Sequence, residues 1–350
     1  MTSSLYQPTR EEIAGILEGE PRYRLDQLWS GLYTQFQHPA DITTLPAALR
    51  TRISNELPES LIEVTRSTSK DGDTVKFLWN LLEGNHPIET VLMYYEDRAT
   101  VCVSTQAGCA MACGFCATGQ AGFNRHLTTG EIVEQVVRAA REAATHSRRV
   151  DNIVFMGMGE PLANEASMWS AIERIHGDIG ISARHITVST VGIVPGIKTL
   201  TSRPLPVNLA VSLHAARNSL RDELVPINQR YPLEMLMQTC RDYLHEKRRR
   251  VSFEWAMIST VNDTDRDAHE LADLCLQLSP AAHVNLIPLN PTPGWPTIGS
   301  SPARVEAFQR LLRSLGVNAT IRQNRGTEID AACGQLAAGQ PVTILPKQLR

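Results

Sequence analysis

Long apolar segments are absent from this 350-residue sequence. No run approaches the ~18 consecutive apolar residues that suggest a membrane-spanning helix. The first residues, MTSSLYQPTREE, contain neither the basic start nor the apolar core of a secretory signal. Low-complexity segments and repeats of the solenoid type are absent too. We therefore expect a cytoplasmic, monomeric globular protein that has no membrane as a partner.

A large net charge is also absent. Hydrophobic residues make up 42% of the chain and charged residues 20%, which is ordinary for a soluble globular protein. The formal net charge of −3 argues against a protein that coats nucleic acid non-specifically, but it leaves a local basic face possible. The basic residues outside the N-terminal region that could neutralise phosphates are Lys247–Arg250, Arg148, Arg149, Arg322 and Arg325.

Cysteine is present in an unusual distribution. The chain has seven cysteines, and four of them fall within CVSTQAGCAMACGFC, which runs from Cys102 to Cys116. In a reducing compartment, clustered cysteines indicate metal or redox chemistry more than structural disulfides. Cys240 and Cys275 lie instead within helical patterns, where a buried thiol is the simplest interpretation.

Three of these cysteines, Cys109, Cys113 and Cys116, form the pattern C-x3-C-x2-C. Three thiolates on one tight loop suit an iron–sulfur cluster or a zinc ion. A structural zinc site normally has four protein ligands, and the sequence offers no obvious fourth. Three ligands on a four-iron cluster would leave one iron open to a substrate or cofactor. The alternative is a zinc knuckle, or buried thiols that lie close together by coincidence.

Strand-like and helical runs alternate over most of the chain. The strand-like runs are ATVCVSTQ, NIVFMGMG, HITVSTVG, VNLAVSLH, VSFEWAMI and HVNLIPLN. Repeated strand–helix units predict an α/β fold with a parallel sheet. About six units are visible, fewer than the eight of a closed TIM barrel, so we predict a partial (β/α)6 TIM-like barrel.

The rest of the chain divides into parts before and after this barrel. Two parts precede the barrel. The first has short helical patterns, and the next is predicted to be a hairpin around a KDGD turn followed by a further strand. The predicted domains are residues 1–58, a small N-terminal helical accessory domain that packs as a cap or contacts a partner; 59–98, a β extension; 99–316, the barrel; and 317–350, a C-terminal segment.

Glycines and polar side chains mark the ends of successive predicted strands. GMGEPL ends the second strand, Ser189 the third, SLH (residues 212–214) the fourth and Asn290 the sixth. Each has an ordinary structural explanation when taken alone, such as a turn glycine or a helix cap. Because the carboxyl ends of barrel strands meet at one face, together they predict a single site.

The cysteine loop after the first barrel strand, with Phe115 before the last cysteine, resembles the radical S-adenosylmethionine (SAM) superfamily. Longer stretches resemble the RlmN/Cfr family of radical SAM RNA methyltransferases. They are DRATVCVSTQAGCAMACGFCATGQAGFNRHLTTGEIVEQV, FMGMGEPL, LAVSLHA, IPLNP and RGTEIDAACGQL. The N-terminal region and the segment GFNRHLTTGEI look more like the RlmN branch than the Cfr branch.

This resemblance implies the cofactors and their ligands. Cys109, Cys113 and Cys116 would hold one [4Fe-4S] cluster, whose open iron binds SAM; reduction of SAM then yields a 5′-deoxyadenosyl radical. The residues that would line the SAM site are Gly159, Glu160, Ser189, Ser212, Leu213, His214 and Asn290.

The resemblance also implies three catalytic residues. Cys333 would carry a methyl group from one SAM, and a radical from a second SAM would activate that group for addition to the adenine ring. Glu89 would accept the ring proton. Cys102 would then attack the sulfur of Cys333, releasing methyladenine and leaving a transient Cys102–Cys333 disulfide. The C-terminal segment must therefore fold back over the mouth of the barrel, near the cluster.

The implied substrates are RNA, which the N-terminal domain, residues 1–58, would contact. The expected activity is methylation at C2 of adenine 2503 in 23S rRNA and of adenine 37 in tRNAs. The expected partners are these RNAs, an electron donor such as flavodoxin or ferredoxin, and a disulfide reductant. The alternatives are Cfr-type C8 methylation of the same rRNA adenine, another radical SAM activity unrelated to RNA, and a zinc-stabilised, non-catalytic RNA-binding module.

Overall fold

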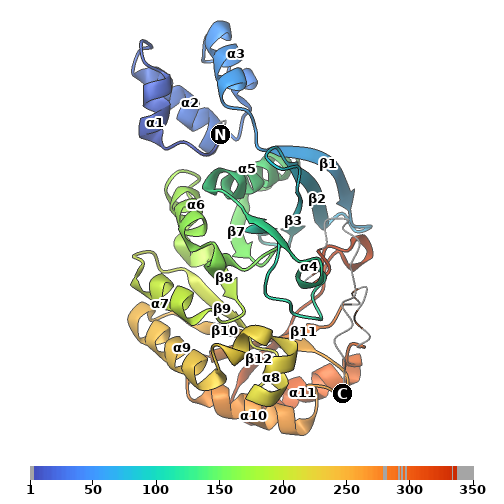
Figure 1. Cartoon of the computed structure of the whole chain (residues 1–350). Helices are drawn as coiled ribbons and strands as arrows, with labels where there is room; N and C mark the ends of the chain where they lie inside the picture. Colours follow the sequence, from blue (N-terminus) through green and yellow to red (C-terminus); the bar gives the residue numbers. More distant parts are fainter. Residues whose placement is uncertain are drawn as a thin grey trace.

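The computed structural model describes residues 4–278, 282–290, 292, 295, 298–332 and 334–336. The N-terminal part contains three helices, α1 (Arg10–Ile16), α2 (Tyr23–Tyr33) and α3 (Ala47–Glu56). Thr9 and Glu12 form a capping box that begins α1. The apolar stripe of α2 is buried, including Leu28, Trp29 and Leu32. In Figure 1 these helices form a separate layer above the rest of the chain.

One ten-stranded sheet runs through the molecule in the order β1-β2-β3-β4-β7-β8-β9-β10-β11-β12. Its first strands pair antiparallel, and β4 through β12 form six successive parallel pairs. The strands are β1 (Leu61–Thr68), β2 (Thr74–Leu81), β3 (Pro87–Tyr94), β4 (Ala99–Cys102), β7 (Val150–Phe155), β8 (Ile186–Thr190), β9 (Asn208–Ser212), β10 (Val251–Met257), β11 (Ala282–Pro288) and β12 (Asn318–Ile321).

The predicted partial barrel is confirmed by this topology. The six predicted strands are β4, β7, β8, β9, β10 and β11, and β12 continues the parallel series. The predicted hairpin is β1 and β2, and β3 pairs with β4, so the β extension continues the barrel sheet. Within the described ranges the two end strands, β1 and β12, are not paired with each other, which leaves the barrel open.

Helices cover the outside of the curved sheet (Figure 1). They are α5 (Thr129–Thr145), α6 (Glu165–Gly177), α7 (Val194–Ser202), α8 (Asn218–Leu224), α9 (Leu233–Lys247), α10 (Asp265–Leu276) and α11 (Pro302–Ser314). A short helix, α4 (Ala117–Gln120), and the small hairpin of β5 (Gln106–Gly108) and β6 (Phe123–His126) follow β4. None of the helices in the described part of the chain is long and apolar enough to cross a membrane.

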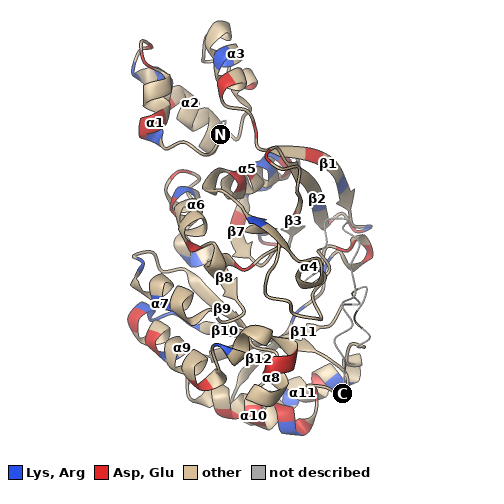
Figure 2. Ribbon diagram, in the orientation of Figure 1, with Lys and Arg blue, Asp and Glu red and all other residues tan. Residues whose placement is uncertain are grey.

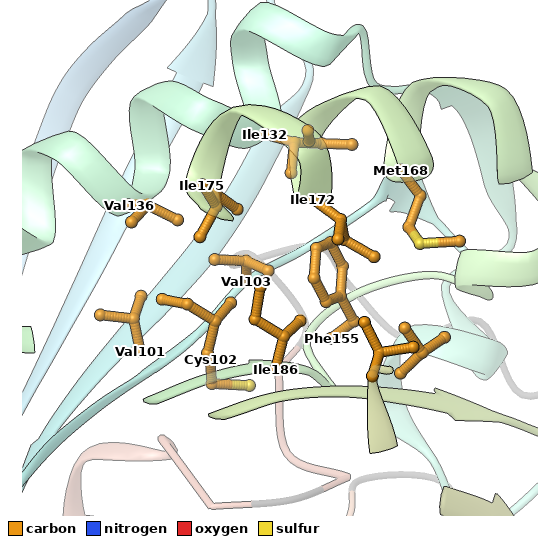
Figure 3. Close-up of a cluster of buried hydrophobic side chains, with 14 of the residues drawn as sticks. Val101, Cys102, Val103, Ile132, Val136, Phe155, Met168, Ile172, Ile175 and Ile186 are labelled. Atoms are coloured by element: carbon orange, nitrogen blue, oxygen red, sulfur yellow. The ribbon is translucent and has the colours of Figure 1, made fainter. Parts of the chain in front are cut away.

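The alternation of side chains along β4 separates the core from the barrel interior. Val101 and Val103 are buried against residues of α5 and α6, such as Ile132 and Ile172 (Figure 3). Cys102, between them, directs its sulfur away from these helices. Because successive side chains of a strand point to opposite faces, the two valines anchor the strand while the thiol faces the interior.

A buried carboxylate joins the N-terminal part to the barrel. Glu134 of α5 accepts hydrogen bonds from Ser60 N (2.7 Å), Ser60 Oγ (2.6 Å) and Leu61 N (3.2 Å). The Glu134 carboxylate also forms an ion pair with Arg138, one turn later in the helix, with 3.4 Å between Oε1 and Nε. These contacts hold the start of β1 against α5, where the chain leaves the N-terminal helices.

We expect Glu134→Gln to lower the free energy of unfolding by about 3 kcal/mol. The amide would present a donor where the backbone and hydroxyl of Ser60 require an acceptor. It would also remove one of the two charge partners of Arg138, which pairs with Glu59 at 2.8 Å as well. Urea denaturation measures the change. The matched control is Glu246→Gln on the exposed face of α9, which should be nearly neutral. Equal stability of the two variants would contradict this role for Glu134.

Candidate active site

A cavity lies at the carboxyl ends of the parallel strands. Its volume is about 1060 Å³, counting the part open to solvent. Ligand sites of parallel barrels occupy this position because loops from several strands converge there. Nine of the predicted site residues line the cavity: Cys109, Cys113, Cys116, Gly159, Glu160, Ser189, Ser212, His214 and Asn290.

The cysteine loop occupies one wall of this cavity. The loop follows β5, where Gly108 has a φ of +76° and a Cβ would lie 2.0 Å from the Gly122 carbonyl oxygen, so only glycine fits. Cys109 N donates a hydrogen bond to the same carbonyl oxygen at 2.7 Å. From Cys109 to Gly122 the loop carries no charged residue (Figure 2). The turn therefore fixes an uncharged loop against the cavity.

The thiols of this loop match the requirements of a metal cluster. Burial raises the pKa of Cys109 to about 12 and raises the pKa of Cys113 well above its ordinary value. A cationic metal centre converts such thiols to thiolate ligands, so their burial suits a bound cluster. Among the described residues, no three His, Cys, Asp or Glu side chains converge as ligands of a single ion do. Each thiolate of a four-iron cluster binds a different iron, so its ligands need no common point of convergence.

The GMGEPL turn places a carboxylate opposite the loop. Gly159 has a φ of +102°, and a Cβ there would lie 2.5 Å from the side chain of Gln106. The carboxylate of Glu160 accepts hydrogen bonds from Val191 N (2.8 Å) and Leu162 N (3.0 Å). Burial raises the pKa of Glu160 to about 7, and these two backbone donors oppose the rise. Glu160 is therefore held rigidly at the ends of β7 and β8.

The segment SLH after β9 contributes a neutral imidazole. His214 Nδ1 accepts a hydrogen bond from Ala256 N at 3.0 Å, so the ring proton is on Nε2. Burial, aided by the charge of Arg221, lowers the pKa of His214 to about 3. The ring packs edge-on against Phe115 of the cysteine loop, with centroids 4.7 Å apart. His214 is thus a neutral hydrogen-bond donor beside the thiols, whereas Leu213 is buried in the core and does not line the cavity.

Glu254, which also lines the cavity, was not predicted as a site residue. Glu254 lies on β10, where it accepts hydrogen bonds from Asn285 Nδ2 (2.8 Å) and Ser252 Oγ (3.0 Å). Burial raises its pKa, against the opposing charge of Arg322 at the end of β12. The only sequence signal was an acidic residue inside the apolar strand VSFEWAMI. Only the curvature of the sheet shows that its side chain faces the cavity.

Glu89 lies outside this cavity, on β3. Its carboxylate forms a nearly buried ion pair with Lys76 Nζ at 3.1 Å. The other carboxylate oxygen, Oε2, is buried and has no hydrogen-bond partner within the described part of the chain. Lys76 Nζ also donates to the carbonyl oxygen of Asp330 at 3.2 Å. The sequence did not identify Lys76, because its partners are 13 and 254 residues away.

A second cavity, of about 450 Å³ counting its open part, adjoins the first. Cys102 lines it together with Ala331 and Ala332, which immediately precede Cys333. Cys333 itself lies outside the described residues. Gly334 directly follows Cys333 in the sequence. Its carbonyl oxygen accepts a hydrogen bond at 2.8 Å from the backbone N of Ala117, the residue after Cys116. The predicted return of the C-terminal segment to the barrel mouth is confirmed for these flanking residues.

The basic residues proposed as phosphate contacts are divided between the two ends of the barrel. Lys247–Arg250 precede β10, and Arg148 and Arg149 precede β7, so they lie at the amino ends of the strands. Arg322 lines both cavities, and Arg325 forms an ion pair with Asp73 at 2.9 Å. Only Arg322 and Arg325 of this set are therefore at the mouth of the site.

Comparison with known proteins agrees with this geometry. Residues 103–274 match the family model described as the radical SAM superfamily. The crystal structure of a radical SAM methyltransferase from Sphaerobacter thermophilus superposes with a TM-score of 0.92 and is 47% identical, covering 96% of this chain and 99% of that one. The fold and the site define the protein as a radical SAM enzyme.

Curated relatives specify the family within that class. A probable dual-specificity RNA methyltransferase RlmN of Chloroflexus aurantiacus is 47% identical over 355 residues, 97% of this chain and 94% of the relative. Another, of Salinispora tropica, is 49% identical and covers 92% of this chain and 89% of the relative. The chain belongs to the RlmN family of radical SAM RNA methyltransferases. It is a SAM-dependent methyltransferase that uses a [4Fe-4S] cluster, and its substrate is RNA.

Proposed function

We propose that this enzyme methylates C2 of adenine 2503 in 23S rRNA and C2 of adenine 37 in tRNAs. The observation that carries the proposal is the position of the C-terminal segment. Ala332 shares a cavity with Cys102, and Gly334 is hydrogen-bonded beside Cys116, so both neighbours of Cys333 lie at the barrel mouth. The relatives named as dual-specificity RNA methyltransferases support two RNA substrates.

The cofactors have matching places in the main cavity. Cys109, Cys113 and Cys116 would hold the cluster on the uncharged loop. SAM would lie among Gly159, Glu160, Ser189, Ser212, His214 and Asn290, with Leu213 contributing through its backbone. When bound, the reduced cluster and SAM supply a carbon-centred radical that can remove a hydrogen atom from a methyl group. The apolar walls of the cavity would exclude water from that radical.

The two outlying cysteines and Glu89 would complete the reaction. Cys333 takes a methyl group onto its sulfur and carries it to the adenine ring. The Glu89 carboxylate accepts the ring proton; its ion pair with Lys76 and its unpartnered Oε2 support this role. The adduct radical would return one electron to the cluster as it loses this proton. Cys102 Sγ, as a thiolate, then attacks Cys333 Sγ. An S–S bond replaces the carbon–sulfur bond, whose electron pair stays on the carbon, and a proton completes the methyl group of the released methyladenine. A two-electron reductant returns both cysteines to thiols.

Mass spectrometry of digested rRNA and tRNA, from cells with and without the gene, tests the proposed targets. We expect 2-methyladenosine at both positions only when the gene is present. The appearance of 8-methyladenosine would indicate Cfr-type chemistry instead. Unchanged methylation of both RNAs on loss of the gene would contradict the proposed substrates. The brown colour, iron and sulfide of anaerobically purified protein test the proposed cysteine ligands separately.

We expect SAM to bind about tenfold more weakly at pH 6 than at pH 8. Glu160, with a pKa of about 7 in the ligand-free protein, is mostly a carboxylate at pH 8 and takes up a proton as the pH falls. The protonated form loses its attraction for the cationic cofactor. His214, with a pKa of about 3, does not titrate in this window. Calorimetry with the iron-loaded protein measures the affinity.

The matched control for this experiment is Glu160→Gln, which has a similar shape and no titration. At pH 8 the variant should bind SAM more weakly than the wild type does. Its affinity should also lack the roughly tenfold change between pH 6 and pH 8 that is expected of the wild type. The ratio of the two SAM affinities at each pH cancels the titrations that both proteins share, including those of SAM itself. A constant ratio from pH 6 to pH 8 would show that Glu160 does not contact the cofactor's charge.

A further inference from the structure

Arg221 of α8 carries a completely buried guanidinium group. The side chain lies beneath the main cavity, in the helix that follows the segment SLH. Burial lowers its pKa to about 10, so it remains a cation at neutral pH. A buried charge is costly unless a partner of opposite charge compensates it. Arg221 has no role in the reaction proposed above, so its burial needs an explanation.

All the hydrogen-bond acceptors of Arg221 in the described residues are neutral. Its Nε donates to Leu213 O (3.1 Å), and its Nη2 donates to Val191 O (2.6 Å) and Ser212 O (3.2 Å). These three carbonyl groups belong to the segments that end β8 and β9, where the SAM site is proposed. The guanidinium therefore links two strand ends of the site.

The fourth acceptor is an amide, Asn228 Oδ1, which Arg221 Nη1 contacts at 2.8 Å. Asp222, a carboxylate whose charge acts on Arg221, accepts a hydrogen bond from Asn228 Nδ2 at 2.6 Å instead. Of the ion pairs found in the described part of the chain, none includes Arg221. The polypeptide thus satisfies the hydrogen bonds of this cation without neutralising its charge.

The charge of Arg221 acts on the cavity above it. Leu220 and Leu224 of the same helix pack in one apolar cluster with Cys113 and Cys116, which line that cavity. Three thiolates give a bound four-iron cluster a net negative charge, which grows by one when the cluster takes up an electron. Charges near an iron–sulfur cluster change its reduction potential. A fixed cation at this place favours the more negative, reduced state.

We propose that Arg221 is the counter-charge of the iron–sulfur cluster. It raises the reduction potential of the cluster, and it positions the Ser212–Leu213 and Val191 backbone around the cofactor. This inference rests on the proposed cysteine ligands and is independent of which RNA is methylated. Arg221 is a positioning residue, because it acts through the protein and the electric field rather than by contact with substrate.

A redox titration of the iron-loaded protein, monitored by electron paramagnetic resonance, tests the proposal. At the midpoint potential of the wild type, Arg221→Gln should have a reduced-to-oxidised ratio at least tenfold lower. That ratio corresponds to a shift of about 59 mV to more negative potential for one electron. Arg221→Lys keeps the charge and should remain close to the wild type. A purely structural role would move the potential equally in both variants.

A charge swap provides a variant that retains Arg221. In Asn228→Asp combined with Asp222→Asn, the carboxylate moves onto the guanidinium while the net charge of the chain is unchanged. This variant should shift the potential in the same direction as Arg221→Gln. If Arg221→Gln fails to fold or to bind iron, the charge-swap variant by itself tests whether the charge of Arg221 sets the potential. A midpoint equal to that of the wild type in the folded, iron-loaded swap would overturn the proposal.

The controls separate this inference from the assignments on which it depends. Iron and sulfide analysis comes first, because a wild-type chain that takes up neither would contradict the cysteine ligands rather than the role of Arg221. Methylation of a different RNA would leave the measured potential unaffected. Thermal unfolding of each variant shows whether the hydrogen bonds to the strand ends survive.

Discussion

A Cys333→Ala variant should form no detectable methyladenine in rRNA or tRNA. Alanine has no sulfur to accept the methyl group, and an electron-poor ring carbon such as C2 of adenine is not nucleophilic enough to attack SAM directly. The loss should therefore be complete rather than partial. Mass spectrometry of RNA incubated with the iron-loaded variant, SAM and a reductant measures it.

The control for that experiment must remove a cysteine without touching the site. Cys275→Ala serves, because Cys275 is buried in α10 and lines neither cavity. We expect it to retain methylation. Iron content should match the wild type in both variants, since the cluster ligands are unchanged. Full turnover by Cys333→Ala would refute a methyl-carrying cysteine in this chain.

A Cys102→Ala variant should accumulate a covalent complex between protein and RNA. Without the resolving thiol, the methylene bridge between Cys333 and the adenine ring cannot be broken by disulfide formation. The position of Cys102 in the second cavity, beside Ala332, supports this role. A gel shift that persists in denaturant and disappears after ribonuclease treatment detects the complex, and peptide mass spectrometry locates the modified residue.

Two variants bracket this result. The double variant Cys102→Ala/Cys333→Ala should form no adduct, because the attachment point is gone. Cys240→Ala, which removes a buried thiol from α9, should turn over without accumulating the complex. Multiple turnover by Cys102→Ala with no trapped species would assign the resolving step to another group.

The architecture was predictable because it follows from local patterns. Alternating strand and helix runs predicted the partial barrel, and six of its seven parallel strands were identified in order. The strand-end rule grouped GMGEPL, Ser189, SLH and Asn290, and the family resemblance singled out Gly159 and Glu160 within GMGEPL. Gly159, Glu160, Ser189 and Asn290 all line the main cavity. These residues share a cavity because parallel strands place their carboxyl ends at one face regardless of the loops between them.

Other features depended on contacts between distant parts of the chain. Lys76 pairs with Glu89 and reaches Asp330, which no local pattern predicts. Glu254 was hidden because an acidic residue in the middle of a strand has no characteristic spacing. Arg221 belongs to no motif in the sequence, although it is completely buried.

The sequence by itself determined the class of chemistry, because a C-x3-C-x2-C loop after a strand and long shared motifs are written in consecutive residues. Only the tertiary structure decided how the charges of the site are compensated. Glu160 and Glu254 are buried acceptors with neutral donors, and Arg221 is a buried cation with neutral acceptors. The physical reason is that burial and electrostatic pairing arise from packing between strand ends, and packing is a property of the folded chain.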